Sequence, residues 1–248
     1  LLPTSGSTGS PKLVKLTYEN IYSNATSISE YLSIDKNERP ITSLPMHYSF
    51  GLSILNSHLI NGATILLTNN SLMEKGFWAF LKSYEATSLS GIPYSFEILK
   101  KLRFFKMDFP YLKTLTQAGG KLNENLNREF ALFCQENDKR FFVMYGQTEA
   151  SPRMSFLLPE YSISKLGSIG VAIPGGKFSL VDSNCEIITK DETIGELVYE
   201  GSNVSMGYAL HGEDLAKDDE NNSILMTGDM AKRDADGFYY IVGRKKRF

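Results

Sequence analysis

Strand-like and helix-like stretches alternate along the first two thirds of the chain, and this alternation limits the possible folds more than any other feature. Short apolar runs rich in β-branched and aromatic residues are followed by longer stretches in which apolar residues recur at helical spacing. The expected strands are residues 41–44, 64–67, 87–91, 112–117 and 140–145. The expected helices are residues 18–32, 77–84, 95–104 and 123–137. This order predicts an α/β fold.

The pattern changes from about Lys165 onward. Short β-rich runs are separated there by Gly, Asn and Asp turns, which predicts a small antiparallel unit. The expected strands of this unit are residues 178–181, 196–199, 224–226 and 238–242.

The composition excludes several classes of protein. Of the 248 residues, 42% are apolar and 22% are charged, which is enough for a core and unlike a disordered tail. The formal net charge of −2 gives no general attraction to nucleic acid, and no apolar stretch approaches the roughly 20 residues that span a bilayer. Cys134 and Cys185 form no CxxC or Cys/His cluster, which argues against structural zinc and a disulfide scaffold. We expect a cytoplasmic protein with no nucleic-acid partner and no membrane span.

The two ends of the chain carry no start or stop signal. The sequence begins with Leu1-Leu2-Pro3, without an initiator methionine, and it stops at Phe248 just after a β-like run. We therefore expect the chain to be the middle portion of a longer protein.

A loop rich in glycine and hydroxyl groups near the start is the most informative stretch. Gly6 and Gly9 permit positive φ and close approach of the backbone, so successive N–H groups can point at one anion. The hydroxyls and the ammonium around them belong to Thr4, Ser5, Ser7, Thr8 and Lys12. Such groups suit a polyphosphate, although the loop is not a Walker A motif. By composition alone, a flexible Gly/Ser linker explains the stretch equally well.

The order of residues in this loop favours the phosphate. Ser5-Gly6-Ser7-Thr8-Gly9-x-Pro11-Lys12 resembles the phosphate loop of the adenylate-forming superfamily, which contains acyl-CoA synthetases, luciferases and nonribosomal-peptide adenylation domains. The sequence departs from that pattern at Leu13, where a glycine usually follows the lysine.

Further segments resemble those of the same superfamily and occur in its order. They are residues 44–51 with His47, residues 117–122 with the Gly119–Gly120 pair, the Tyr-Gly-x-Thr-Glu signature at 145–149, Gly167 to Gly170 with Pro174 to Gly176, Gly195 to Leu197 with Gly207-Tyr208, Thr227-Gly228-Asp229, and Gly243-Arg244. Alone, Tyr145 is explained as a core tyrosine and residues 227–229 as an ordinary turn. All of them in register are hard to explain by chance.

The resemblance implies part of the large N-terminal domain of adenylate-forming enzymes, with α/β layered subdomains and a small β-barrel-like subdomain. Residues 1–36 would hold the phosphate loop and the remainder of the first α/β subdomain, and residues 37–160 would form the second. Residues 161–243 would form the β-rich subdomain, and residues 244–248 would begin the hinge to a C-terminal domain, with Lys246 at the hinge.

The resemblance also implies a role for each matched residue. The residues implied to hold the β- and γ-phosphates of ATP are Thr4, Ser5, Gly6, Ser7, Thr8, Gly9 and Lys12. Glu149 would ligate Mg²⁺, and Thr148 would donate a hydrogen bond to the α-phosphate or the acyl carbonyl. His47 would lie beside the acyl pocket, for which Tyr48, Phe50, Tyr94 and Met154 are further candidates.

The nucleoside would lie between the later segments. Tyr145 would stack on adenine, and the residues implied to accompany it are Gly119, Gly120, Lys121, Gly146 and Gln147. Asp229 would accept hydrogen bonds from the ribose hydroxyls, and Arg244 would secure the same sugar.

These roles predict ATP-dependent activation of a carboxylic acid to acyl-AMP with release of pyrophosphate. The acyl group would then pass to a thiol, either CoA or the phosphopantetheine of an acyl-carrier protein. Because the attacking carboxylate and ATP are both anionic, catalysis requires charge screening and alignment with the α-phosphorus. Thr148, Glu149, Lys12 and His47 are the expected catalytic residues. The chain by itself is expected to have little or no activity, because relatives carry a further lysine in the C-terminal domain.

Two alternatives stay open. An amino-acid adenylation domain would place an Asp directly after an aromatic residue to pair with the substrate ammonium, whereas His47-Tyr48-Ser49-Phe50 contains no carboxylate. A non-catalytic nucleotide-binding module would keep the fold without turnover, whereas this chain retains the charged residues Lys12, Glu149 and Asp229.

Overall fold

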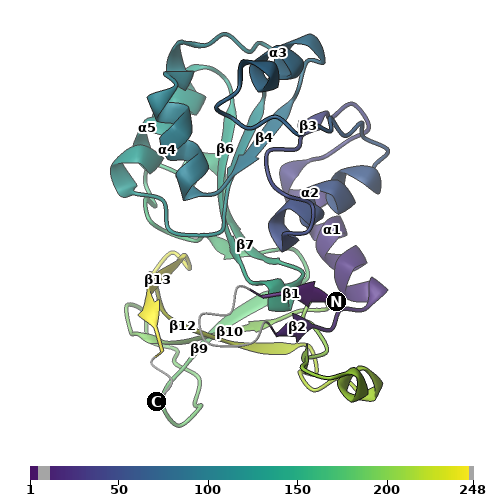
Figure 1. Cartoon of the computed structure of the whole chain (residues 1–248). Coiled ribbons are helices and arrows are strands. Elements are labelled where there is room, and N and C mark those ends of the chain that lie inside the picture. The colour runs from purple at the N-terminus through teal and green to yellow at the C-terminus, as the bar shows by residue number, and fades with distance from the viewer. Residues whose placement is uncertain (5–11, 246–248) are drawn as a thin grey trace.

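The computed structural model describes residues 1–4 and 12–245. Within these residues the strands form three sheets, of six, four and three strands. Figure 1 shows the larger sheet in one half of the molecule with helices on both faces, and the four-stranded sheet in the other half. The predicted α/β fold is confirmed, as is the antiparallel unit toward the C-terminus.

The six-stranded sheet has the order β3-β4-β5-β6-β7-β8. Its strands are β3 (Pro40–Ile41), β4 (Ser88–Gly91), β5 (Thr114–Gln117), β6 (Arg140–Gly146), β7 (Arg153–Leu157) and β8 (Val171–Ala172). The first four strands run parallel, while β7 and β8 are antiparallel to their neighbours. The carboxyl ends of β4, β5 and β6 therefore meet at one edge of the sheet.

Helices cover both faces of this sheet (Figure 1). They are α1 (Tyr18–Leu32), α2 (Ser49–Leu59), α3 (Lys75–Ser83), α4 (Pro93–Lys101) and α5 (Glu124–Glu136). Successive residues of β6 enter opposite cores: Phe141 packs with the residues of α3, α4 and α5, and Phe142 with those of α1 and α2. Such a strand is apolar without interruption because side chains alternate between two buried faces. Of the described helices, none is long and apolar enough to cross a membrane.

The smaller sheets are antiparallel. The four-stranded sheet contains β9 (Lys177–Val181), β10 (Gly195–Glu200), β12 (Ile224–Arg233) and β13 (Tyr239–Arg244), and the three-stranded sheet contains β1 (Leu2–Pro3), β2 (Leu13–Val14) and β11 (Tyr208–Ala209). Short 3₁₀ helices are η1 (Phe104–Lys106), η2 (Thr148–Ala150), η3 (Pro159–Tyr161) and η4 (Gly212–Ala216). The core below α1 and α2 continues onto the four-stranded sheet through Phe178 and Leu197. The subdomain boundaries at residues 36, 160 and 243 remain a proposal.

The two-residue strands β1, β2, β8 and β11 were not predicted, and three further segments differ from the sequence-based expectation. Residues 64–67 are not a strand, because only a single bridge joins Leu66 to Ile41. Helix α2 was not predicted, since its buried side includes Ser53, Ser57 and His58 and the apolar spacing is weak. Strand β7 was also missed because all five of its residues are buried, including an arginine and a serine, so no alternation is visible.

The start of α1 was predicted correctly and has a capping box. The Thr17 hydroxyl accepts the Asn20 N–H at 3.0 Å, and the Asn20 side-chain oxygen accepts the Thr17 N–H at 2.9 Å. We expect Thr17→Ala to lower the free energy of unfolding by about 1 kcal/mol, because one backbone donor loses its partner. Urea denaturation measures this loss, and Thr17→Ser serves as the matched control that keeps the acceptor. An unchanged midpoint for Thr17→Ala would mean that packing alone fixes the start of the helix.

Candidate functional site

The Tyr-Gly-x-Thr-Glu segment lies at the carboxyl end of β6. This strand pairs in parallel with β5 and antiparallel with β7, so the direction of the sheet changes here. In α/β sheets, ligands bind beyond the carboxyl ends of the parallel strands. Position 146 has room only for glycine, because a Cβ there would lie 1.8 Å from the Pro152 carbonyl oxygen. The end of β6 is therefore a candidate ligand site.

Three side chains, two from the end of β6 and one from β13, meet at the Asp229 carboxylate. The Tyr145 hydroxyl donates to Oδ2 at 2.6 Å, and the Gln147 amide donates to the same oxygen at 2.9 Å. Arg244 Nε donates to Oδ1 at 3.1 Å. The β12–β13 pairing places Asp229 directly opposite Arg244. The structure therefore brings the end of β6 and the four-stranded sheet together at a single carboxylate.

The Asp229 carboxylate is held in place but is not saturated. It is 8% exposed, and a carboxylate has about four lone-pair positions, of which these contacts use three. Burial, together with the neighbouring Asp229 charge, raises the pKa of Tyr145 well above its usual range. The phenol therefore stays protonated and donates to Asp229. One acceptor position on Oδ1 stays free, and a second becomes available when the exposed Arg244 side chain turns from Oδ1 to a bound ligand.

Thr148 and Glu149, which follow Gln147 in the sequence, are the first two residues of η2. The hydroxyls of Thr148 and Ser49 lie 3.0 Å apart, which ties η2 to the first residue of α2. Glu149 Oε1 accepts a hydrogen bond from the Tyr208 hydroxyl at 2.6 Å, and the Glu149 backbone carbonyl accepts the Ser205 N–H at 2.8 Å. The carboxylate is half-buried, and its second oxygen accepts no hydrogen bond from the described residues.

The same tyrosine links this carboxylate to the phosphate-loop candidate. Strand β11, which contains Tyr208, pairs with β2, which follows Lys12. The Lys12 ammonium lies 5.2 Å from the centre of the Tyr208 ring, and the Lys12 carbonyl accepts the Thr4 N–H at 3.0 Å. Leu13, the departure from the family pattern, is a strand residue here and pairs with both Pro3 and Ala209. Both described ends of the loop are thereby fixed beside Glu149.

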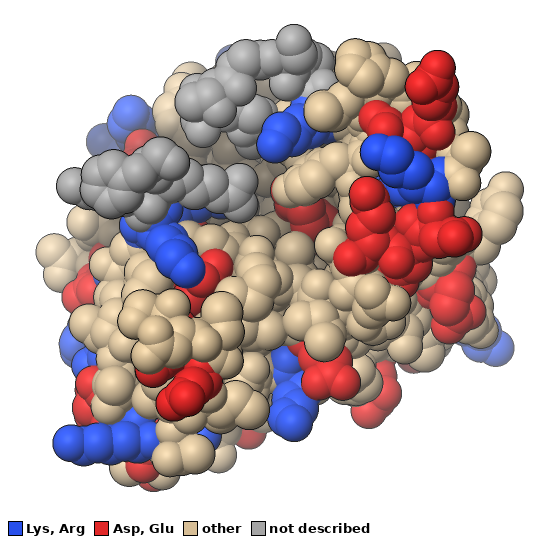
Figure 2. All heavy atoms as spheres, turned by 90° about the horizontal axis from the view of Figure 1, so that it is seen from below, with Lys and Arg blue, Asp and Glu red and all other residues tan. Residues whose placement is uncertain are grey.

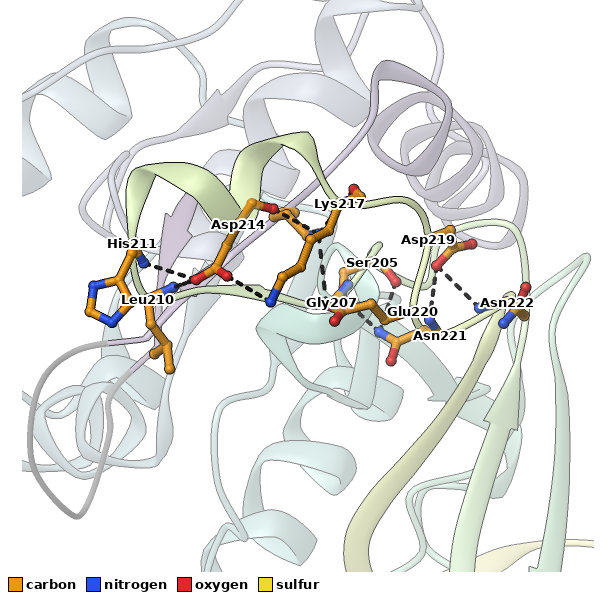
Figure 3. Close-up of polar contacts among 11 residues, drawn as sticks. Ser205, Gly207, Leu210, His211, Asp214, Lys217, Asp219, Glu220, Asn221 and Asn222 are labelled. Carbon is orange, nitrogen blue, oxygen red and sulfur yellow. Dashed lines mark hydrogen bonds and ion pairs between the residues drawn. The ribbon is translucent and has the colours of Figure 1, made fainter.

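The segment that follows β11 is held by its own polar contacts (Figure 3). The Lys217 ammonium and the backbone N–H groups of Leu210 and His211 bind the Asp214 carboxylate and hold its pKa well below the usual value. Lys15, next to β2, anchors the segment by donating to the carbonyls of Asp214 and Lys217 at 3.1 and 3.3 Å.

Figure 2 shows acidic side chains gathered over this region of the surface. The segment after β11 contains five acidic residues, Glu213, Asp214, Asp218, Asp219 and Glu220. Asp219 accepts the N–H groups of Asn221 and Asn222, and Glu220 lies 3.7 Å from the Lys15 ammonium. These contacts explain several of the carboxylates as structural groups that shape the segment.

The glycine pair lies beyond the end of β5. Gly119 and Gly120 have φ values of +79° and +156°, and a Cβ on Gly119 would lie 2.9 Å from the Tyr48 hydroxyl oxygen. The Gln117 amide donates to the Gly120 carbonyl at 2.8 Å and fixes the turn. Lys121 is exposed and lies 3.5 Å from Glu124, so its ammonium already has an acidic neighbour.

The structure gives positions for only some of the remaining predicted site residues. His47 is exposed in the turn before α2, two residues from the Ser49 that contacts Thr148. Tyr94 is 61% exposed, whereas Met154 is fully buried in the core. The predicted phosphate ligands that lie outside the described residues are Ser5, Gly6, Ser7, Thr8 and Gly9, and the predicted hinge residue Lys246 also lies outside them.

No chemical role was assigned from the sequence to four residues that the structure places at or near this site. Ser49 and Tyr208 contact Thr148 and Glu149, but only the folded chain brings them there. His58 and Arg153 are buried side by side with other polar groups below α2. Arg153 follows the signature by four residues, and the apolar residues Met154, Phe156 and Leu157 that come after it were the available hint.

The buried His58 makes stability depend on pH. Burial lowers the pKa of His58, and the nearby Arg153 charge acts in the same direction, while Glu38 and the Ile54 carbonyl oppose it. The unfolded chain therefore takes up a proton below about pH 6.5, whereas the folded chain resists it. We expect stability to fall as the pH drops through that range, and His58→Gln to flatten this dependence in urea titrations. An unchanged slope in the variant would assign the acid sensitivity to other groups.

Comparison with known proteins gives a consistent match. Residues 1–209 match the family of AMP-binding enzymes. The 2-succinylbenzoate–CoA ligase of Bacillus licheniformis is 30% identical over 246 residues, which cover 99% of this chain and 49% of that protein. A mitochondrial medium-chain acyl-CoA ligase of Rattus norvegicus is 30% identical over 250 residues, covering 98% of this chain and 40% of that protein.

A solved structure agrees with the sequence matches. The O-succinylbenzoate coenzyme A synthetase of Bacillus subtilis, in complex with ATP and a magnesium ion, superposes with a TM-score of 0.84 at 27% identity. The match covers 99% of this chain and 50% of that one. The chain thus spans about half the length of the curated relatives it matches, or somewhat less.

Proposed function

This chain belongs to the family of AMP-binding enzymes, and from that premise we propose that it takes part in the ATP-dependent activation of a carboxylic acid. The acid's carboxylate oxygen attacks the α-phosphorus of ATP, and the bond from that phosphorus to the bridging oxygen of pyrophosphate breaks. A thiol then attacks the acyl carbonyl, a thioester forms and AMP leaves. We propose this activity for a protein of the length of its relatives, of which this chain supplies a part.

One observation carries the proposal: a single carboxylate, Asp229, organises the end of β6. Tyr145, Gln147 and Arg244 all donate to it, and Thr148 and Glu149 follow within two residues of Gln147. An oriented, buried carboxylate with spare acceptor capacity suits the two hydroxyls of a ribose. The Thr148 hydroxyl can donate a hydrogen bond to a phosphate, and the Glu149 carboxylate can bind the cation that accompanies it.

The nucleoside would lie between this carboxylate and the glycine turn. We assign the adenine to Gly119, Gly120 and Tyr145, since positive-φ glycines leave the backbone open to a flat base. Gly146, Gln147 and Lys121 border the same space. Asp229 and Arg244 would bind the ribose.

The phosphates would lie toward β2. Thr4 and Lys12 flank the loop of Ser5, Gly6, Ser7, Thr8 and Gly9, and Lys12 would contribute a positive charge to the β- and γ-phosphates. Thr148 would donate to the α-phosphate or the acyl carbonyl. His47 would border the acyl group.

Glu149 fits a magnesium ion. Mg²⁺ prefers oxygen ligands and is usually held by one or two carboxylates together with substrate phosphates. Among the described residues no cluster of three or more His, Cys, Asp or Glu is present, so one carboxylate at Glu149 matches that mode better than an all-protein cage. When bound, the cation would neutralise charge on the phosphates. The hydrogen bond from Tyr208 holds the Glu149 carboxylate in place.

We further propose CoA as the thiol, with the phosphopantetheine of an acyl-carrier protein as the alternative acceptor. The names of the matched relatives support CoA. A cytoplasmic location is proposed because Cys134 and Cys185 both carry free thiols.

ATP–pyrophosphate exchange by the full-length protein tests this function. A panel of carboxylic acids is compared with reactions that lack any acid, and a panel of amino acids tests the amino-acid alternative. We expect exchange that rises with one class of non-amino carboxylic acid. Exchange that never depends on an acid, or that is absent with all of them, would contradict the proposal.

A further inference from the structure

One side chain, Tyr208, contacts two opposite charges of the candidate site. Its hydroxyl donates to Glu149 Oε1 at 2.6 Å, and the Lys12 ammonium lies 5.2 Å from the centre of its ring. These contacts use different parts of the side chain, because the hydroxyl lies in the plane of the ring and a cation is attracted to the face. Tyr208 can therefore make both contacts at the same time.

Lys12 and Glu149 do not pair with each other. The ion pairs among residues 1–4 and 12–245 all join other charged groups. A direct ion pair would satisfy each of these two charges with the other and leave less of either for a ligand. The tyrosine thus holds an ammonium and a carboxylate beside one side chain with both charges still available.

The backbone that carries Tyr208 is fixed from two sides. Strand β11, which begins with Tyr208, pairs with β2, whose first residue directly follows Lys12. On the other side, the Ser205 N–H donates to the Glu149 carbonyl at 2.8 Å. The same short segment is bonded both to the strand after Lys12 and to the turn that contains Glu149. The fold therefore sets the position of this tyrosine relative to both charges.

The hydroxyl acts on the carboxylate. Mg²⁺ requires near-octahedral geometry and takes only one or two protein carboxylates, so the orientation of each one matters. Hydrogen bonds to a ligating carboxylate typically change the affinity for a metal by about 10- to 100-fold. Because Glu149 Oε1 is bonded to Tyr208, the other oxygen would face the cation.

The ring acts on the ammonium. Lys12 is exposed, and a long lysine side chain loses rotamer freedom when it binds a phosphate. Attraction to the face of the Tyr208 ring restrains the ammonium before a ligand arrives and leaves its charge in place. Less freedom is then lost when the phosphate binds.

We propose that Tyr208 is a positioning residue that holds the Glu149 carboxylate for the cation and the Lys12 ammonium for the phosphates, and that keeps these two charges from pairing. The inference rests on the proposed function, in which the two groups bind ATP and its magnesium ion. It adds the residue that couples them.

Nucleotide binding without turnover tests the role of the hydroxyl in the full-length protein. An ATP analogue with a methylene group in place of the α,β-bridging oxygen cannot release pyrophosphate, and calorimetry gives its affinity in EDTA and in excess Mg²⁺. We expect Tyr208→Phe to reduce the gain in affinity from Mg²⁺ by about tenfold. The affinity in EDTA should stay within about twofold of wild type because the ring is kept. Tyr111→Phe, the same change at an exposed tyrosine, should alter neither value.

Two further variants test the ring and the coupling. Tyr208→Ile keeps a residue type that suits a strand but removes the ring, so the affinity in EDTA should also fall, by about two- to fivefold. In a protein that already carries Glu149→Gln, Tyr208→Phe should not change the gain from Mg²⁺ further, because the hydroxyl acts through that carboxylate. A merely structural role of the tyrosine would lower both affinities in every background.

The outcomes separate this inference from the function on which it rests. If wild type does not bind the analogue, or binds it equally well with and without Mg²⁺, the proposed function is contradicted. If Mg²⁺ raises the affinity of wild type and of Tyr208→Phe by the same factor, the hydroxyl does not position Glu149 and the inference is overturned. An unchanged affinity of Tyr208→Ile in EDTA would overturn the role of the ring. If thermal unfolding shows that Tyr208→Ile is not folded, Tyr208→Leu takes its place, and Tyr208→Phe decides the role of the hydroxyl by itself.

Discussion

Replacing Glu149 with glutamine is expected to slow ATP–pyrophosphate exchange by about 10²–10³-fold in the full-length protein. Glutamine keeps the size of the side chain, and its carbonyl can still accept the Tyr208 hydroxyl. It lacks the negative charge that attracts a hard cation to the phosphates. The magnesium concentration that gives half-maximal exchange should rise at the same time, which a simple loss of folding would not produce.

Glu160→Gln is the matched control for this variant. Glu160 is an exposed residue of η3, so the same chemical change there should leave both the rate and the magnesium dependence at wild-type values. If Glu149→Gln has full activity and the same magnesium concentration gives half-maximal exchange, Glu149 does not bind the cation. The wild-type rate also distinguishes an enzyme from a non-catalytic nucleotide-binding module, because such a module would show no exchange even before the substitution.

Replacing Asp229 with alanine is expected to weaken AMP binding by about 10²-fold or more, since two charge-assisted hydrogen bonds to a ribose are lost together. The substitution also leaves Tyr145, Gln147 and Arg244 without their shared acceptor. Isothermal titration calorimetry gives the affinity, and thermal unfolding reports how much of the effect is structural.

Two companion variants sharpen that experiment. Tyr145→Phe removes one donor to Asp229 but keeps the ring, so it should weaken AMP binding by less than about tenfold. Asp108→Ala, an exposed aspartate beyond η1, should change nothing. Equal affinities for wild type and Asp229→Ala would contradict the assignment of the ribose to this carboxylate.

Individual helices and strands were predictable where the capping residues and the spacing of apolar residues indicate the same element. Helix α1 begins at the predicted residue because Thr17 and Asn20 cap it and its apolar residues recur at helical spacing. Strand β6 was anticipated because both of its faces are buried and its sequence is apolar throughout. Residues 64–67 have the same apolar character but lie where only one bridge to β3 forms, so neighbouring structure decided against a strand.

The polar interior was less accessible to sequence reasoning. A serine-rich helix such as α2 and a strand that begins with Arg153 look like loops, because their polar side chains are buried by partners far away in the chain. The signature residues of the site were recognisable by their order. Their contacts with Ser49 and Tyr208 depend on how α2 and the β2–β11 pair are placed by the fold, which no local pattern encodes.

The account as a whole depends on separate segments forming one nucleotide site, and a crystal structure of the protein with AMP tests this most directly. We expect the adenine against the Gly119–Gly120 turn and the Tyr145 ring, and both ribose hydroxyls within hydrogen-bond distance of the Asp229 carboxylate. AMP bound elsewhere on the molecule, with Asp229 contacting no part of the sugar, would contradict it.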